Sequence, residues 1–452
     1  MAVLLILLAL GLLIAGAWAG MSVLILAPFL AALAALVAGA PVLAAYTQVF
    51  MAAAGGFVVS FFPLFLLGAL FGKVMDASGA AQILARAIAK AVGPANAILA
   101  VVLACAVLTY GGVSLFVVAF VAWPLARALF AETGLPARLI PATIALGAFT
   151  FTMTALPGTP SIQNAIPMAT FGTTPFAAPG LGVIAAAAML GLGMVWLRYR
   201  ATALAGDEPP EMPPQSPRDV PLPLWRALFP IMSVGMVTLG MGWVVLPSLE
   251  TSYLALPRYG STDLGRVGGL WSVIAALTVA LVLALILSRP PHLMKVLNDG
   301  AESALLPLFN TASLVGFGAV IATLPGFEVL RQGLDGLSSG NVVVTAALSS
   351  GALAGITGSA SGGMSIALDV LGPSLMAQAV AQGVDPALLH RVVSVATGGL
   401  DTLPHNGAVI TLLGICGMSH RKAYGDIFVV AVLAPTLACA LIIALGDAFG
   451  SF

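Results

Sequence analysis

Asp401 and His405 stand four residues apart in an otherwise apolar stretch, with Pro404 between them. A histidine titrates near neutral pH, and a neighbouring carboxylate can orient its ring or share its proton. If the stretch lies in a membrane, an ionisable residue there indicates a functional site by default. The pair could then carry a coupling proton. The alternative is that Asp401 and His405 only satisfy each other and cap an interrupted helix.

Four short polar segments interrupt long apolar runs, at residues 109–114, 154–164, 357–365 and 401–407. The candidate substrate-binding residues in them are Thr109, Gly111, Gly112, Ser114, Gly158, Thr159, Ser161, Asn164, Ser359, Ser361, Gly362, Gly363, Thr402, His405 and Asn406. The tip of a helical hairpin and the break in a helix both expose free N–H groups, which attract an anion. Their free carbonyls, with nearby hydroxyls, suit a small cation. Any single Ser or Thr is explained equally well by tight packing, but four such segments together indicate a binding site.

No Lys or Arg falls within the four polar segments. A carboxylate would therefore be held by helix N-termini, hydroxyls, Asn164 and Asn406, with His405 when protonated. One carboxylate suits this weak positive field better than two or three. No nucleophile–His–acid set and no metal or cofactor motif is visible, and the GSASGG run at 358–363 lacks the Lys-Ser/Thr of a phosphate loop. The other histidines are expected near solvated helix ends: His292, His390 and His420.

The composition identifies the solvent of this chain. Of its 452 residues, 60% are hydrophobic and 8% are charged, against about 25% charged in a soluble domain. There are 17 basic and 17 acidic residues, none of them before Lys73. This excludes a soluble enzyme, a disordered chain and a nucleic-acid binder, which needs a basic patch. The three cysteines lie in apolar segments and suggest neither metal spacing nor a disulfide framework. Lipid must surround most of the chain.

We expect an all-α polytopic membrane protein with about ten transmembrane helices. A span needs about 20 apolar residues, which places spans near 3–19, 22–40, 54–75, 138–170, 178–198, 225–247, 266–288, 303–324, 386–417 and 421–446. The spans at 138–170 and 386–417 are too long for one plain helix and carry Pro and Gly at their centres, so we expect broken helices. Regions 95–130 and 342–382 have Gly/Ser centres and are expected to be re-entrant hairpins.

The distribution of basic residues orients the protein. With both termini outside, 13 of the 17 basic residues lie inside and four lie outside, namely Arg258, Arg266, Arg331 and Arg391. The proline-rich segment 200–223 then becomes a cytoplasmic linker. Two amphipathic segments, 79–93 and 326–337, are either interfacial helices or ordinary connectors.

Three short matches relate the two halves of the chain. Pro63-Leu64-Phe65 recurs as Pro307-Leu308-Phe309, Gly111-Gly112 recurs as Gly362-Gly363, and Leu156-Pro157 recurs as Leu403-Pro404. Their order is the same in both halves. We therefore expect two repeats, 1–199 and 224–452, each with five spans, one hairpin and one broken helix. Because five is odd, the second repeat is inverted, as in many secondary transporters.

The segments FFPLFLLGALFGKVMDASGAA, TYGGVSLFV and LDTLPHNGAVITLL resemble the gluconate permease family of the ion transporter superfamily, and most closely its 3-hydroxybutyrate permeases. The resemblance covers nearly the whole chain. It implies proton-coupled symport of a small hydroxy-carboxylate across the bacterial cytoplasmic (inner) membrane, with no cofactor. It also implies a homodimer that works by an elevator motion, with the substrate at the hairpin tips and helix breaks.

Two departures and three alternatives stand beside this resemblance. Superfamily members that couple to sodium carry Ser-Asn-Thr triplets at the breaks, whereas this sequence has Pro-Gly-Thr-Pro-Ser and Pro-His-Asn-Gly. That speaks against sodium coupling, which stays open as an alternative. A passive facilitator or channel would not need Asp401 and His405. A membrane-embedded enzyme would need a convergent nucleophile or metal set, which the sequence does not show.

Overall fold

The computed structural model describes residues 2–18, 21–93, 96–113, 115–206, 222–327, 329, 340–404 and 406–452. Every regular element within these ranges is a helix. Eight of the helical stretches are long and apolar enough to cross a membrane. This confirms the expected all-α polytopic fold, and shorter apolar helices such as α1 (Ala2–Trp18) and α2 (Val23–Val37) accompany the eight.

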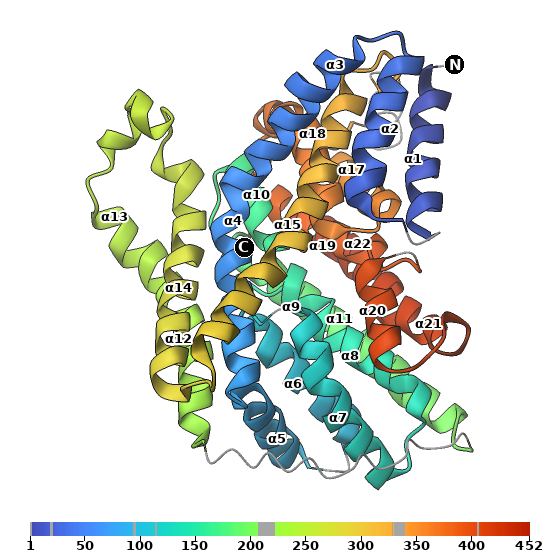
Figure 1. The fold of residues 1–452 in the computed structure, drawn as a ribbon, viewed down its shortest axis with the longest axis vertical. Coiled ribbons are helices and arrows are strands. Elements are labelled where there is room, and N and C mark those ends of the chain that lie inside the picture. Colours follow the sequence, from blue (N-terminus) through green and yellow to red (C-terminus); the bar gives the residue numbers. More distant parts are fainter. Residues whose placement is uncertain are drawn as a thin grey trace.

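Two long helices cross each other and form the centre of a first group of helices (Figure 1). They are α4 (Met51–Ala77), which continues α3 (Val42–Ala44) through a π-helical turn, and α15 (Leu293–Ala322). Each contains the proline of a matched Pro-Leu-Phe segment. Gly300 permits the crossing, because a Cβ there would lie 3.2 Å from the Leu70 Cα. Around this pair pack α2 and α14 (Leu264–Ser288), while α1 packs on α2 and α12 (Leu224–Gly240) packs on α14. Helix α12 leads through a π-helical turn into α13 (Leu246–Ser248).

The remaining helices form a second group in which the two halves of the chain interlock. From the first half come α5 (Ala80–Val92), α6 (Ala97–Tyr110), α7 (Leu115–Thr133), α8 (Ile140–Ala148), α9 (Phe151–Thr154), α10 (Ile162–Phe171) and α11 (Pro179–Ala203). From the second half come α17 (Val342–Thr357), α18 (Ala360–Gln382), α19 (Pro386–Leu400), α20 (Gly407–Ile415), α21 (His420–Phe428) and α22 (Ala434–Phe449). Helix α19 packs on α9 and α10, α21 packs on α8, and α11 packs on α22.

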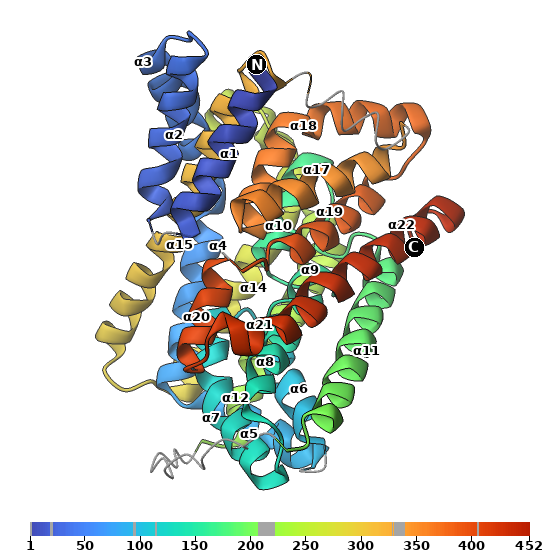
Figure 2. The ribbon, with the colours of Figure 1, turned by 90° about the vertical axis from the view of Figure 1, so that its right-hand side faces the viewer.

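The two expected hairpins are present as helix pairs. The first is α6–α7, with Gly111 and Gly112 at its tip, and the second is α17–α18, with Gly358 at its tip. Figures 1 and 2 place the α6–α7 pair near one end of the long axis and the α17–α18 pair near the other. This arrangement agrees with hairpins that enter from opposite sides.

Both expected helix breaks are present as well. The first separates α9 from α10, where Pro157 and Pro160 cannot donate a backbone hydrogen bond and Gly158 adopts a φ of 79°. The second separates α19 from α20. A polar residue precedes each new helix, Ser161 before α10 and Asn406 before α20. The Asn406 side chain caps α20, whereas the Ser161 side chain makes no cap hydrogen bond.

The ends of the molecule follow the expected alternation of spans. In both views the N-terminus and the turn between α2 and α3 lie at the upper end, whereas α5 and the C-terminal end of α11 lie at the lower end (Figures 1 and 2). Helix α5, within the amphipathic segment 79–93, buries Ala81 and Leu84 and exposes Arg86 and Lys90. Most of the 326–337 segment, and residues 207–221 of the linker, lie outside the described residues.

Candidate substrate site

The first hairpin tip lies directly against the first helix break. Tyr110 Oη donates to the Pro157 carbonyl at 2.9 Å. Gly112, with a φ of 89°, approaches Pro160 so closely that a Cβ would lie 3.4 Å from the Pro160 Cγ. At Gly158 a Cβ would lie 3.1 Å from Tyr110 Oη and 2.5 Å from the Phe176 ring. Gly112 and Gly158 are therefore required for the tip and the break to meet.

The second tip and the second break meet in the same way. Asn406 Nδ2 donates to the Gly358 carbonyl at 2.9 Å, while its Oδ1 accepts from Ala408 N at 2.6 Å and Val409 N at 3.0 Å. One side chain thus caps α20 and ties it to the tip of α17–α18. The Asp401 carboxyl group faces the backbone amide of Ala360, in the first turn of α18. The four polar segments therefore form two tip–break pairs.

Buried oxygen atoms without a partner concentrate at these two pairs. Within the described residues, eight buried side-chain oxygens have no hydrogen-bond partner. Five of them belong to the four polar segments: Thr109 Oγ1, Thr159 Oγ1, Gln163 Oε1, Ser365 Oγ and Asp401 Oδ1. A buried polar atom left unpaired costs about 1–3 kcal/mol, so the unpaired atoms in all four segments are candidates for contact with a ligand or a proton.

Asn310 Oδ1, in α15, is another of these unpaired oxygens, and sequence reasoning missed it. It follows the Pro307-Leu308-Phe309 match directly, and that position was the available signal. The next residue, Thr311, contacts Ser361 of the second tip, with 3.3 Å between the hydroxyl oxygens. Helix α15 therefore supplies polar groups to the second tip–break pair.

Several other predicted residues have structural partners instead. Thr402 donates to the Ala431 carbonyl at 2.8 Å, and Ser161 donates to the Met153 carbonyl. Ser359 caps α18 by accepting from Gly362 N at 3.1 Å. The glycines Gly111, Gly362 and Gly363 allow helix packing, because a Cβ at these positions would meet Ile231 at 2.8 Å, Leu314 at 2.5 Å and the Ala354 amide at 2.2 Å. Ser114 and His405 lie outside the described residues.

Asn164, predicted to bind substrate, is fully used by the protein. Its Nδ2 donates to the Thr159 and Pro175 carbonyls, both at 3.0 Å. Its Oδ1 accepts from Arg391 Nη1 at 3.3 Å and lies 3.1 Å from His390 Nε2. With both amide hydrogens and both lone pairs engaged and no exposed surface, Asn164 has no capacity left for a ligand.

The structure corrects the predictions for His390 and Arg391. Both were expected at a solvated outer end, and both are fully buried, at 0% exposure. Arg391 donates to the Thr154 carbonyl at 3.2 Å and to the Ala177 carbonyl at 2.8 and 3.1 Å, and His390 Nδ1 lies 2.6 Å from Thr173 Oγ1. A planar guanidinium can satisfy several carbonyls at once. The sequence could not indicate these contacts of Arg391, because the loop that covers its side chain, around Ala177, is distant in the chain.

Two carbonyls at each break are occupied by side-chain donors from elsewhere in the chain. Thr154 O accepts from Ser394 Oγ at 2.9 Å as well as from Arg391, and Pro157 O accepts from Tyr110. In the second break, Thr402 O accepts from Tyr424 Oη at 3.2 Å, and Pro404 O lies 2.9 Å from His420 Nε2. The expectation that His420 is simply solvated is therefore wrong. Carbonyls that were expected to face a ligand are held by the protein.

Within the described residues, no group of three or more His, Cys, Asp or Glu side chains could hold a metal ion. The described side chains at the two tip–break pairs carry hydroxyls, amides and one carboxyl group. Such groups can bind a small polar anion and a proton.

Comparison with known proteins identifies the kind of protein that carries this site. No family model matches the chain. It is 42% identical over 456 residues, covering 96% of each chain, to YxjC of Bacillus subtilis (strain 168), described as an uncharacterized transporter. Its fold resembles the crystal structure of the YdaH transporter of Alcanivorax borkumensis, described as having an unusual topology, with a TM-score of 0.59, 18% identity, and coverage of 90% of this chain and 89% of that one. The chain belongs to the same family of membrane transporters as YxjC.

Proposed function

We propose that this transporter is a proton-coupled symporter of a small hydroxy-monocarboxylate, such as gluconate or 3-hydroxybutyrate. One observation carries the proposal. Asp401 Oδ1 is buried without a partner among the described residues, at the point where the second break meets the first turn of α18. A buried carboxylate is costly unless it is paired or protonated. If Asp401 binds a proton together with the substrate and releases it after transport, its buried carboxyl group is neutral while the loaded carrier crosses.

Helix N-termini support an anionic substrate. Helices α10, α18 and α20 all begin at the tip–break pairs, and each brings partial positive charge. Ser359 and Asn406 cap part of the first turns of α18 and α20. Thr109 Oγ1, Thr159 Oγ1 and Ser365 Oγ remain free to contact the hydroxyl and carboxylate of the substrate. The buried cation of Arg391, behind the first break, adds positive potential without contacting the ligand.

The occupied carbonyls favour a proton over sodium as the coupling ion. A sodium site needs several oxygen ligands, which in such transporters include carbonyls of the unwound backbone. Here the carbonyls of Thr154, Pro157, Thr402 and Pro404 already accept hydrogen bonds from side chains. Asp401 is the one acidic side chain in the four polar segments, so protonation is the simpler way to neutralise it.

The division into two helix groups supports an elevator motion in a homodimer. The crossing pair α4 and α15, with α2, α12 and α14, would form the scaffold, and the group that carries both tip–break pairs would move. Both repeats contribute to each group, so the two tip–break pairs can travel together. In this proposal the two inverted repeats are 1–199 and 224–452, and the scaffold provides the dimer interface.

The decisive experiment is uptake by the purified protein in proteoliposomes. With an imposed inward proton gradient and no sodium, labelled 3-hydroxybutyrate or gluconate should accumulate above its external concentration. A proton ionophore should reduce uptake to equilibration. If uptake needs sodium, the coupling ion is sodium and not the proton. If the substrate equilibrates without accumulating under either gradient, the protein is a passive facilitator.

A further inference from the structure

Helix α21 runs beside the second break and presents two donors to it. His420 and Tyr424 are four residues apart and share one face of α21, with ring centroids 6.1 Å apart. His420 Nε2 lies 2.9 Å from the Pro404 carbonyl, and Tyr424 Oη donates to the Thr402 carbonyl at 3.2 Å. Neither side chain belongs to the four polar segments.

The two carbonyls that accept these bonds lie between two helices. Helix α19 ends at Leu400, and the backbone of Thr402 and Pro404 lies in the break before α20 begins at Gly407. Carbonyls in a break have no partner from a regular helix and must find one elsewhere. The side chains of α21 supply these partners, because the short segment between α19 and α20 does not provide them itself.

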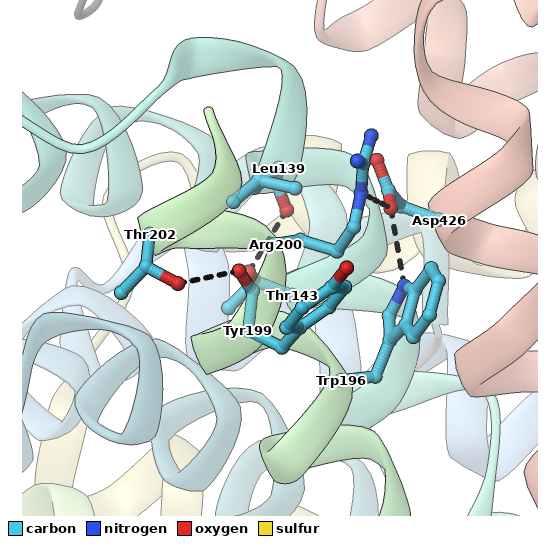
Figure 3. Close-up of polar contacts among 7 residues, drawn as sticks. All are labelled: Leu139, Thr143, Trp196, Tyr199, Arg200, Thr202 and Asp426. Carbon is cyan, nitrogen blue, oxygen red and sulfur yellow. Dashed lines mark hydrogen bonds and ion pairs between the residues drawn. The ribbon is translucent and has the colours of Figure 1, made fainter. Parts of the chain in front are cut away.

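Helix α21 is in turn fixed to the first half of the chain. Asp426 is 2% exposed and accepts from Arg200 Nε at 2.8 Å and from Trp196 Nε1 at 3.1 Å. Figure 3 shows Trp196 and Arg200, one turn apart on α11, converging on the same carboxylate oxygen. Loss of one partner from a buried ion pair is strongly destabilising. The contacts of Arg200 and Trp196 with Asp426 therefore fix the position of α21, and α21 in turn fixes the position of the second break.

We propose that α21 is a positioning element for the second break: His420 and Tyr424 hold the carbonyls of Pro404 and Thr402, and the Arg200–Asp426–Trp196 junction holds α21. The contacts keep Asp401 and the first turn of α20 aligned with the tip of α17–α18. The structural part of the proposal is independent of the substrate. Its consequence for transport rests on the proposed function.

Hydrogen–deuterium exchange of the full-length protein in nanodiscs tests the structural part. The test variants are Tyr424→Phe, which removes only the hydroxyl, and the double variant His420→Leu/Tyr424→Phe. Loss of one hydrogen bond should speed exchange of the amides in 403–410 by about fivefold, and loss of both by more, because local opening becomes easier. The first break, 155–164, should exchange at the native rate in every variant.

Two matched variants complete the exchange experiment. Tyr199→Phe makes the same chemical change on a side chain that is 61% exposed and should leave exchange unchanged. The double variant His420→Gln/Tyr424→Phe keeps an N–H donor at position 420 and should exchange at nearly the rate of Tyr424→Phe alone. Native exchange at 403–410 in the double variant would overturn the proposal, and so would equal acceleration at both breaks, which would show general loosening.

Transport kinetics test the consequence. For 3-hydroxybutyrate uptake, Tyr424→Phe should raise the apparent KM about fivefold, with Vmax within about twofold of native. An unchanged KM beside accelerated exchange would restrict α21 to a structural role and overturn its role in substrate binding. If the native protein transports neither 3-hydroxybutyrate nor gluconate, the proposed function fails, and the exchange experiment still decides whether α21 positions the break.

Discussion

At the scale of single residues, the site is defined by atoms that lack a partner. Asp401 Oδ1, Thr159 Oγ1 and Ser365 Oγ are buried and unpaired among the described residues, whereas Asn164 has every hydrogen-bonding position filled. A ligand or proton can lower the free energy of the unpaired oxygens by bonding to them, whereas at Asn164 it would have to displace an existing hydrogen bond. Asp401 is the one of these groups that can change its charge, so coupling should depend on it.

Replacing Asp401 by Asn should separate exchange from accumulation. An amide keeps the shape of the side chain but cannot release a proton, so the variant should behave as a permanently protonated carrier. Counterflow exchange of 3-hydroxybutyrate should stay within a few-fold of native, while accumulation driven by a proton gradient should fall at least about tenfold, the scale of a typical coupling energy. Asp263→Asn, at a 68% exposed side chain, is the control and should accumulate normally. Full accumulation by Asp401→Asn would remove the coupling role.

The charges at the site predict the substrate class. Arg391 is the cation nearest to the first break in the described contacts, but its N–H groups are spent on carbonyls and on Asn164. Because the four polar segments contain no Lys or Arg, the described contacts offer no guanidinium or ammonium there to a second carboxylate. Lactate, 3-hydroxybutyrate and gluconate should therefore compete for uptake at concentrations at least about tenfold lower than succinate or citrate. A dicarboxylate or tricarboxylate as the tightest competitor would contradict this prediction.

At the residue level, the sequence signals for the candidate site were local. Asp401 stood out because a carboxylate in an apolar run is rare, and Thr159 because it lies between Gly158 and Pro160. His390, Arg391 and His420 were misplaced, since each finds its partner in another segment: His390 with Thr173, Arg391 with Ala177, and His420 with Pro404. Contacts between residues so far apart in sequence depend on the fold, and the spacing of residues along the chain does not predict them.

At the scale of elements, both hairpins and both breaks were predictable. Their glycines and prolines interrupt runs that are otherwise continuous, and backbone chemistry allows few alternatives at such points. The roles of the individual glycines were less accessible. Gly363 was expected to approach a ligand, yet a Cβ there would lie 2.2 Å from the Ala354 amide. This glycine is needed for the arms α17 and α18 to touch.

Replacing Gly363 by Ala should therefore destabilise the second hairpin. The added methyl group cannot be accommodated unless α17 and α18 separate, which should cost about 1–3 kcal/mol and lower the midpoint of thermal unfolding in detergent. Gly191→Ala is the matched control, because a Cβ on α11 at that position meets nothing within 4 Å. Since Ala favours a helix over Gly by about 1 kcal/mol, the control should be neutral or more stable. Equal midpoints for both variants would contradict the packing role of Gly363.

At the scale of the whole molecule, the structure separates two ends that the spans connect alternately. The N-terminus and the α2–α3 turn lie at one end, and α5 with the end of α11 lies at the other (Figure 1). The sequence predicted this alternation from span lengths alone. The interlocking of the two halves, with α19 against α9 and α21 against α8, was not predictable, because apolar helix faces carry little information about their partners in lipid.

The basic residues predict the orientation of the protein in the membrane, and burial of Arg391 strengthens the bias. With Arg391 removed from the outer set, 4 − 1 leaves three basic residues outside against 13 inside. In a background without Cys105, Cys416 and Cys439, a cysteine at Tyr259, which is 48% exposed, should react with an impermeant maleimide in intact cells. A cysteine at Ala205, just beyond α11 and exposed, should react only after permeabilisation, because the charge bias predicts that this end of the molecule lies in the cytoplasm. Labelling of Ala205→Cys from outside, with Tyr259→Cys protected, would invert the orientation and turn α5 and the 200–223 linker outward.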